Sequence, residues 1–366
     1  MKRAVAGIFV LVLLSAIALA EEPPTEADGG WWKIPYPQPF DVSNLAEQPS
    51  EVRVEGNRFV DARGDTVVFR GVSIADPDKV ERDGRWSKAL FEAVRSWGAN
   101  VVRIPVHPAA WRGRGREAYL ELLDQAVVWA SEVDLYLVVD WHSIGNLESG
   151  LFQHPMYDTS KSETLDFWRT VAARYAGIST VALYEIFNEP TGFGGRLGTV
   201  SWPAWRAFNE EVIGVVRAHD PSAIPLVAGF DWAYDLTPVR RLPVRAGGVG
   251  YVSHPYPQKV EPPWEPKWKR DFGFVAAEHP LVVTEFGFTP GGGVPVDGDE
   301  TYGEAIVAYL DRLGASWIAW CFDPDWGPQL IEDWQYTPTL SGAFFRRALR
   351  AGDTPPAGTD NRSEQE

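Results

Sequence analysis

Two glutamates stand at positions where an acidic side chain is costly. Glu189 ends the largely apolar run 182–189, and Glu285 ends the similar run 281–285. A carboxylate in such surroundings has to be hydrogen-bonded, paired with a cation or used in chemistry. Cleavage of a glycosidic bond needs two carboxylates across a cleft, because one protonates the leaving oxygen while the other attacks or activates water. We therefore take Glu189 and Glu285 as the catalytic candidates, at a separation that the sequence does not give.

Other readings of these acidic residues stay open. Glu185 lies four residues before Glu189, so strand alternation puts both on the same face with Glu185 a full layer deeper. We interpret Glu185 as a buried partner for an arginine or as a helix-facing residue, although it could be the functional acid instead. Glu285 could be a salt-bridged structural residue.

Short β-rich runs alternate with helical patterns between residues 51 and 350. The strand candidates are 68–74, 100–106, 135–140, 181–187, 224–229, 250–253, 280–285 and 316–320. The helical patterns are 88–97, 116–133, 161–175, 202–220 and 301–313. An opening hairpin is expected over 52–60 and 65–69. This alternation predicts a single α/β domain, a (β/α)8 TIM barrel with a short N-terminal β-hairpin.

The alternative architecture is a doubly wound sheet. It would concentrate its polar residues at one switch point, whereas here they follow many strands, and no glycine-rich dinucleotide motif follows the first strand. In a barrel these strand ends converge on one mouth. The polar and aromatic residues expected there, besides the two glutamates, are Arg103, His107, Asp140, Trp141, His142, Asn188, Asp231, Trp232, His254, Tyr256, Trp320 and Asp323. Of these, we interpret His107 as a loop or core residue.

Charge and composition exclude several classes of partner and cofactor. The 366-residue chain carries a net charge of −16, which argues against nucleic acid or an anionic membrane as its main partner. Its one cysteine, Cys321, allows no internal disulfide and no cysteine-based zinc site. The six histidines show no metal-binding spacing. We therefore expect no metal and no cofactor.

Four segments are expected along the chain: a signal peptide over 1–20, a flexible leader over 21–50, the barrel over 51–350 and a disordered tail over 351–366. A basic start, an apolar stretch and the small-residue pattern Ala-Leu-Ala at 18–20 predict export to the extracellular space or the periplasm. An uncleaved membrane anchor is the alternative. After cleavage of the signal, we expect a monomer without membrane contact.

Taken together, the motifs resemble glycoside hydrolase family 5, the cellulase-like retaining enzymes. The resemblance covers about 51–350 and rests on Arg103 in VVRIP, His142 in VVDWH, Asn188 and Glu189 in YEIFNEP, His254 and Tyr256 in SHPYP, Glu285 in VVTEFG and Trp320 in WIAWCF. Ser73 departs from the family, which usually has asparagine there, and we expect it in the outer cleft. The insert 322–330 is also less typical.

The resemblance implies a role for each of these residues. Glu189 would be the acid/base and Glu285 the nucleophile, kept ionised by Arg103 and Tyr256. Asn188 would bind the sugar 2-hydroxyl, and Trp320 would form the platform at the cleavage point. His142 and His254 would contact hydroxyls or orient the glutamates. Weaker candidates for flanking subsites are Trp141, Trp232, Asp323 and Trp326.

The substrate implied is a polysaccharide or oligosaccharide. We favour an endo-β-1,4-glucanase, because the motifs around Asp140 and Tyr184 look like the bacterial cellulase version, and an acidic chain suits a neutral glucan. The alternatives are a β-mannanase and a β-glycosidase of short oligosaccharides. A non-catalytic sugar-binding barrel is the alternative from a different class.

Overall fold

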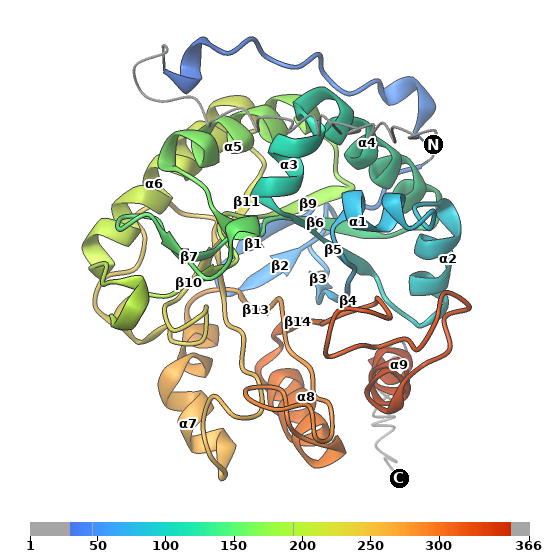
Figure 1. Ribbon diagram of the computed structural model, residues 1–366, viewed down its shortest axis with the longest axis vertical. Coiled ribbons are helices and arrows are strands. Elements are labelled where there is room, and N and C mark those ends of the chain that lie inside the picture. The colour runs from blue at the N-terminus through green and yellow to red at the C-terminus, as the bar shows by residue number, and fades with distance from the viewer. Residues whose placement is uncertain (1–29, 46, 193, 353–366) are drawn as a thin grey trace, which may run out of the picture.

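The computed structural model describes residues 30–45, 47–192 and 194–352. Eight parallel strands close into a barrel surrounded by helices, which confirms the predicted fold class (Figure 1). In order around the barrel, the strands are β4 (Arg70–Ser73), β5 (Val101–Val106), β6 (Tyr136–Trp141), β9 (Val181–Glu185), β11 (Ile224–Ala228), β12 (Gly250–Val252), β13 (Leu281–Val283) and β14 (Ser316–Ala319). Each of them lies within one of the predicted runs or extends it by one residue.

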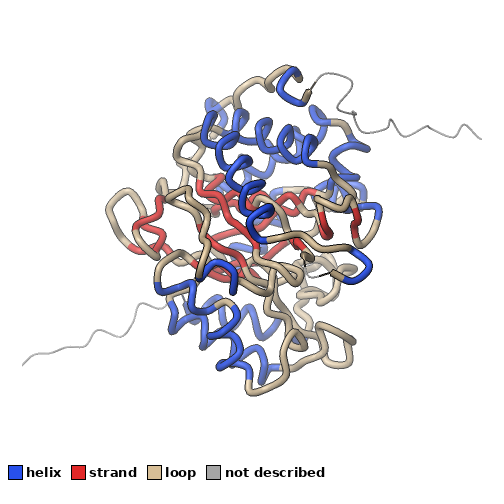
Figure 2. Tube along the Cα trace, turned by 90° about the vertical axis from the view of Figure 1, so that its left-hand side faces the viewer, coloured by secondary structure: helices blue, strands red, loops and turns tan. Residues whose placement is uncertain are grey.

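Helices cover the outside of the barrel (Figure 2). They are α1 (Pro77–Arg82), α2 (Lys88–Ser96), α3 (Pro108–Arg114), α4 (Arg116–Glu132), α5 (Lys161–Tyr175), α6 (Trp202–His219), α7 (Trp264–Asp271), α8 (Glu300–Leu313) and α9 (Leu340–Gly352). The sequence analysis did not predict α1, α3, α7 or α9. The first three span only six to eight residues, too few for a repeating apolar pattern to be distinctive.

Alternate strand residues divide the apolar core into two parts. Val101, Val138 and Leu183 point into the barrel, while Val102, Val139 and Tyr184 pack against the helices. Both sets are almost fully buried. Because both faces of each strand are covered, the strands read as continuous apolar runs.

Two small sheets flank the barrel. The expected hairpin is present as β1 (Arg53–Glu55), β2 (Arg58–Val60) and β3 (Thr66–Val67), and Phe59 of β2 belongs to the apolar cluster inside the barrel. The second sheet, formed by β7 (Ile144–Asn146), β8 (Leu151–Phe152) and β10 (Glu189–Pro190), was not predicted. Its strands have two or three residues, so no alternating pattern marks them.

Residues 21–29 of the predicted leader lie outside the described residues, whereas its part 30–45 makes defined contacts. Residues 30–45 follow α5 along the outside of the barrel (Figure 1). Arg169 of α5 donates hydrogen bonds to the carbonyls of Trp32 and Ile34, and the backbone N–H of Phe40 donates to the carbonyl of Arg174 at 2.8 Å. This segment is therefore attached to α5.

The predicted signal peptide lies outside the described residues, as does the predicted tail beyond residue 352. Within the described ranges, no helix combines the length and apolar character required to cross a bilayer.

Gly71 is required where β4 meets β5. A Cβ atom at this position would lie 1.9 Å from the carbonyl oxygen of Val101 in β5. We expect Gly71→Ala to lower the free energy of unfolding by about 3 kcal/mol, because backbone atoms must shift to make room. Urea denaturation followed by tryptophan fluorescence measures the change.

The matched control is Gly214→Ala in α6. A Cβ there meets nothing within 4 Å, and alanine in a helix interior is expected to raise the free energy of unfolding by about 0.5–1 kcal/mol. Equal effects of the two substitutions would contradict the close approach of β4 and β5.

Candidate active site

The two catalytic candidates lie at one mouth of the barrel. Glu189 follows β9 and pairs, as part of β10, in parallel register with Ile144 of β7. Glu285 lies two residues beyond the end of β13. Both line a cleft of about 630 Å³, and each is only 7% exposed. One carboxylate oxygen of Glu189 and one of Glu285 lie within 4.8 Å of each other, so the structure brings the expected pair together.

Arg103 lies fully buried beneath this pair. Its guanidinium donates to Glu185 at 2.8 and 3.0 Å and to Glu285 at 3.4 Å. It also lies 2.9 Å from a carboxylate oxygen of Asp140. Although burial opposes ionisation of Glu185, Arg103 and His254 lower the pKa of its carboxyl to about 2. Glu185 is therefore a buried partner of an arginine, as we interpreted it, and it remains a permanent anion.

Asn188 is held so that one donor stays free. Its Oδ1 accepts a hydrogen bond of 2.6 Å from Arg103, which assigns the orientation of the amide. Its Nδ2 is buried and has no hydrogen-bond partner among the described residues. A buried donor next to Glu189 is available to an oxygen of a bound ligand.

Glu285 receives hydrogen bonds on both oxygens. The hydroxyl of Tyr256 donates to Oε1 at 2.7 Å, and Arg103 donates to Oε2. Burial raises the pKa of Glu285 and the negative charge of Glu189 adds to this, while His254, Arg103 and Tyr256 oppose it. The two predicted partners are thus in place, and they counteract the cost of burying the anion.

His254 is a fully buried link between two glutamates, Glu189 and Glu185. Its Nδ1 lies 2.9 Å from Glu189 Oε1, and its Nε2 lies 2.9 Å from Thr284 Oγ1. Thr284 in turn donates to Glu185 at 2.9 Å. Burial disfavours the imidazolium, but the surrounding glutamates raise the pKa of His254 to about 9. His254 therefore orients Glu189 as a cation, and with both ring nitrogens engaged it keeps no free group for a sugar hydroxyl.

Within the described ranges, Glu189, His254 and Glu285 are the one group of three histidine, cysteine, aspartate or glutamate side chains close enough to hold a metal ion. A protonated His254 donates through both nitrogens and offers no lone pair to a cation. The geometry is therefore that of an acid–base site.

Aromatic side chains form the walls of the cleft. Trp320 and His142 line it with their rings nearly parallel, at an interplanar angle of 3° and a centroid distance of 5.4 Å. His142 also contacts Asp140, with Nδ1 2.6 Å from Oδ2. Burial, followed by the nearby cations, lowers the pKa of His142 well below its usual value. Neutral His142 can thus offer hydrogen bonds but no charge.

Trp232 lines the same cleft from the loop after β11, as expected for a candidate flanking subsite. Its indole N–H donates to Gln153 at 2.7 Å, and the ammonium of Lys259 lies 5.1 Å from its ring centroid. Asp231, Trp232 and Ala233 all have left-handed backbone, with φ of 56°, 55° and 59°. Such conformations are unfavourable for these residues and are held by the surrounding structure, often at functional sites.

Three residues that we expected to face the cleft do not face it in the structure. Trp141 is fully buried and stacks on Phe167 at a centroid distance of 4.2 Å, because its side chain points outward under α5. Asp323 is fully buried in an ion pair of 2.6 Å with Lys79 and faces no subsite. Ser73 is buried beneath the cleft, 3.5 Å from the guanidinium of Arg103.

The sequence analysis missed several residues of the site. Tyr157, Gln153 and Lys259 line the cleft from loops that follow the strands, and Thr284 connects His254 to Glu185. None of these loop residues directly follows a strand of the barrel, so they carried no signal. Thr284 directly precedes Glu285, and its place at a strand end was a signal that could have been used.

A closed parallel barrel with two glutamates at the carboxyl ends of its fourth and seventh strands has the architecture of a barrel glycoside hydrolase. Residues 60–325 match the family model for cellulase, glycosyl hydrolase family 5. The chain belongs to glycosyl hydrolase family 5, as its motifs predicted.

Relatives in this family are moderately similar. Endoglucanase A of Butyrivibrio fibrisolvens is 29% identical over 218 residues, covering 56% of this chain and 45% of the relative. Endoglucanase E-5 of Thermobifida fusca is 26% identical over 326 residues, covering 86% of this chain and 61% of the relative. The chain thus spans about half the length of these curated relatives. A solved β-glucanase from Saccharophagus degradans, in complex with cellotetraose, is 45% identical with a TM-score of 0.85, covering 88% of this chain and 99% of that one.

The charged state of His254 predicts a pH-dependent stability. Its folded pKa of about 9 lies above the value of about 6.5 expected after unfolding, so the stabilisation is complete below pH 6.5 and is lost as pH rises through 9. We expect the free energy of unfolding to fall by about 3 kcal/mol more in the native protein than in a His254→Gln variant between pH 6 and pH 10. Urea denaturation at stepped pH measures both. If the free energy of unfolding changes with pH in the same way in the native protein and in the variant, His254 is neutral in the folded state.

Proposed function

We propose that the protein is a retaining endo-β-1,4-glucanase that acts by double displacement. The observation that carries this proposal is the approach of Glu189 and Glu285 to within 4.8 Å. Retaining glycosidases place their carboxyl groups about 5–5.5 Å apart, whereas inverting ones leave about 6.5–9.5 Å for a water molecule.

In the first step, a carboxylate oxygen of Glu285 attacks the anomeric carbon. The bond to the leaving oxygen breaks, and protonated Glu189 delivers its proton to that oxygen. The negative charge of Glu285 ends in a covalent glycosyl ester, and Glu189 becomes a carboxylate. The His254 cation, 2.9 Å from Glu189, stabilises the carboxylate that forms.

In the second step, Glu189 takes a proton from a water molecule, whose oxygen attacks the same carbon. The ester bond breaks, and Glu285 leaves as a carboxylate that Tyr256 and Arg103 stabilise. The free Nδ2 of Asn188 donates to the sugar 2-hydroxyl, a contact that strengthens in the oxocarbenium-like transition state. Two inversions give net retention.

The proposed substrate is a neutral β-1,4-linked glucan. It is supported by the similar β-glucanase solved with cellotetraose, by the endoglucanase relatives, and by the net charge of −16, which would repel polyanions. Trp320 and Trp232 both line the cleft, and their aromatic faces suit stacking on sugar rings.

We also propose that the chain is exported and acts as a monomer. The pattern of residues 1–20 supports export.

Glu189 and Glu285 should differ when the leaving group is changed. We expect Glu285→Gln to lose about 10⁴-fold or more in kcat on every substrate, because no nucleophile remains. Glu189→Ala should lose as much on cellotetraose, but much less on a dinitrophenyl β-cellobioside, whose leaving group needs no proton. Added azide should then yield the β-glycosyl azide, identified by NMR.

Glu211→Gln, a half-exposed glutamate of α6 on the rim of a separate cavity, serves as the control and should leave kcat unchanged. An α-configured azide product would mean an inverting enzyme.

Substrate preference separates the proposed glucanase from a mannanase. We expect reducing-sugar release from carboxymethylcellulose, barley β-glucan and glucomannan, and little from pure galactomannan, with all activity absent in Glu285→Gln. Turnover mainly on galactomannan would show that the protein is a β-mannanase, and the proposed double-displacement mechanism would still apply. Binding without turnover of any of them would point to a non-catalytic barrel.

A further inference from the structure

The loop after β11 contains a rare backbone conformation. Five non-glycine residues in the described ranges have left-handed backbone, and three of them, Asp231, Trp232 and Ala233, are consecutive. The carbonyl of Asp231 accepts from the N–H of Tyr234 at 3.3 Å, which closes one left-handed turn. A residue with a Cβ atom disfavours this conformation. Contacts with the surrounding structure must therefore hold the turn.

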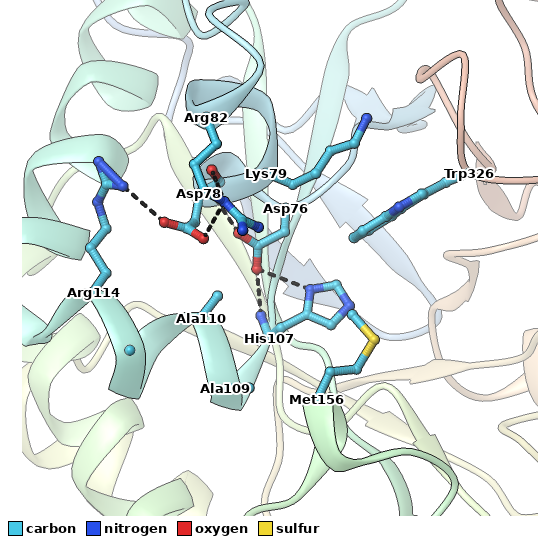
Figure 3. Close-up of a pocket in the computed structure, with 11 residues that line it drawn as sticks. Asp76, Asp78, Lys79, Arg82, His107, Ala109, Ala110, Arg114, Met156 and Trp326 are labelled. Atoms are coloured by element: carbon cyan, nitrogen blue, oxygen red, sulfur yellow. Dashed lines mark hydrogen bonds and ion pairs between the residues drawn. The ribbon is translucent and has the colours of Figure 1, made fainter. Parts of the chain in front are cut away.

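Other loops of the same mouth are fixed with ordinary backbone. His107, directly after β5, has a φ of −73°, and its N–H and Nδ1 contact the side chain of Asp76 at 2.8 and 2.9 Å (Figure 3). Trp326, in the loop after β14, lies 5.1 Å from the ring of His107, and its N–H donates to Asp323 at 3.0 Å. The left-handed turn after β11 is thus particular to its own position.

The turn lies between Glu189 and its partner His254. On one side, the N–H of Trp232 donates at 3.2 Å to the carbonyl of Pro190, which directly follows Glu189. On the other side, the carbonyl of Ala233 accepts from the N–H of His254 at 3.3 Å. Nδ1 of His254 in turn lies 2.9 Å from Glu189 Oε1. These contacts form a closed ring, so the shape of the turn affects how His254 meets the carboxyl group of Glu189.

Lys259 attaches to this turn at its start. Its ammonium donates to the carbonyl of Asp231 at 2.7 Å, and its side chain is only 12% exposed. The same ammonium lies 3.8 Å from a carboxylate oxygen of Asp231 and 5.1 Å from the ring centroid of Trp232. One side chain therefore contacts the first two residues of the turn.

We propose that the turn 231–233 positions Glu189 against His254, and that Lys259 is the positioning residue that holds the turn in its left-handed form. This role rests on the proposed function, in which Glu189 protonates the leaving oxygen. Without Lys259 the turn relaxes toward a more favourable backbone, and the carboxyl group of Glu189 shifts. Proton transfer to the leaving oxygen then becomes less effective, because it depends on the placement of the acid. Lys259 acts through the turn and not by touching the sugar.

Two aryl β-cellobiosides of similar size test this role. Phenyl β-cellobioside needs a proton on its leaving oxygen, whereas dinitrophenyl β-cellobioside does not. In Lys259→Met we expect kcat/KM to fall about tenfold on the phenyl substrate and less than about twofold on the dinitrophenyl one. A group that only binds the sugar would affect both substrates alike, because they share the cellobiosyl unit. Lys259→Arg, which can also donate to the carbonyl, should recover most of the loss.

A double-variant experiment tests the strain in the turn. Glycine adopts left-handed backbone without the cost that a Cβ atom brings, so Ala233→Gly should make the turn less dependent on Lys259. In this background, Lys259→Met should cost no more than about threefold in kcat/KM on the phenyl substrate. Ala233 is fully buried and does not line the cleft, so the substitution changes no group that a sugar contacts.

Lys267→Met is the matched control. The ammonium of Lys267 in α7 also donates to a backbone carbonyl, that of Glu261, but this lysine does not line the cleft. Its substitution should leave kcat/KM on both substrates unchanged. Urea denaturation of each variant shows whether it is folded under the assay conditions.

Proton NMR reports the contact between His254 and Glu189 without any substrate. The hydrogen-bonded imidazole proton on Nδ1 should give a downfield signal, assigned by its absence in His254→Gln. We expect this signal to shift or weaken in Lys259→Met and to return in Lys259→Arg.

The possible results distinguish a wrong role for Lys259 from a wrong function. Equal losses on the two cellobiosides, an undiminished loss in the Ala233→Gly background, or an unchanged His254 signal in Lys259→Met would overturn the positioning role. A selective loss that Ala233→Gly reduces, together with the altered His254 signal, supports it. If the native protein hydrolyses no β-glucan and no cellobioside while the His254 signal still depends on Lys259, the glucanase function alone is overturned.

Discussion

The guanidinium of Arg103 holds the catalytic mouth of this barrel together. It lies fully buried at the second strand and reaches Asp140 and Glu185, while Asn188 and Glu285 accept its remaining hydrogen bonds. Buried carboxylates on neighbouring strands repel one another unless a cation lies between them. The planar fork of arginine can serve several acceptors at once, which a lysine ammonium does less well. The glutamate pair depends on this charge.

A second buried cation, His254, gives the two catalytic glutamates different surroundings. His254 contacts Glu189 and, through Thr284, is connected to Glu185. Glu285 instead accepts from Tyr256 and Arg103. Two identical side chains less than 5 Å apart therefore have different hydrogen-bond partners. Such differences in environment are what let one carboxyl group act as an acid/base while its neighbour acts as a nucleophile.

Two tryptophans outside this buried network are held in place in a different way. Trp232 and Trp326 belong to loops, and each loop is fastened by a lysine: Lys259 donates to the carbonyl of Asp231 at 2.7 Å, and Lys79 pairs with Asp323. The two glutamates and their partners thus lie at or just beyond the ends of barrel strands, while these two tryptophans lie on loops, a part of a barrel that can vary without disturbing the strand ends.

The sequence by itself determined the barrel, its eight strands and the residues at the strand ends. Strands buried on both faces read as apolar runs, and a polar residue that ends such a run stands out. That is why Glu189, Glu285, His254 and Tyr256 were found before their contacts were known, while Arg103 stood out as a charge inside the apolar strand β5.

Only the tertiary structure decided which strand-end residues face the cleft. In the sequence, Trp141 and Asp323 follow an apolar strand run just as their neighbours do. In the structure, however, Trp141 turns outward beneath α5 and Asp323 turns toward Lys79. The direction of a side chain at the last position of a strand depends on where the backbone leaves the sheet. Lys79 and Asp323 are 244 residues apart, and no local pattern encodes a contact of that separation. The separation of the glutamates, and with it the stereochemical outcome, likewise follows from closure of the barrel.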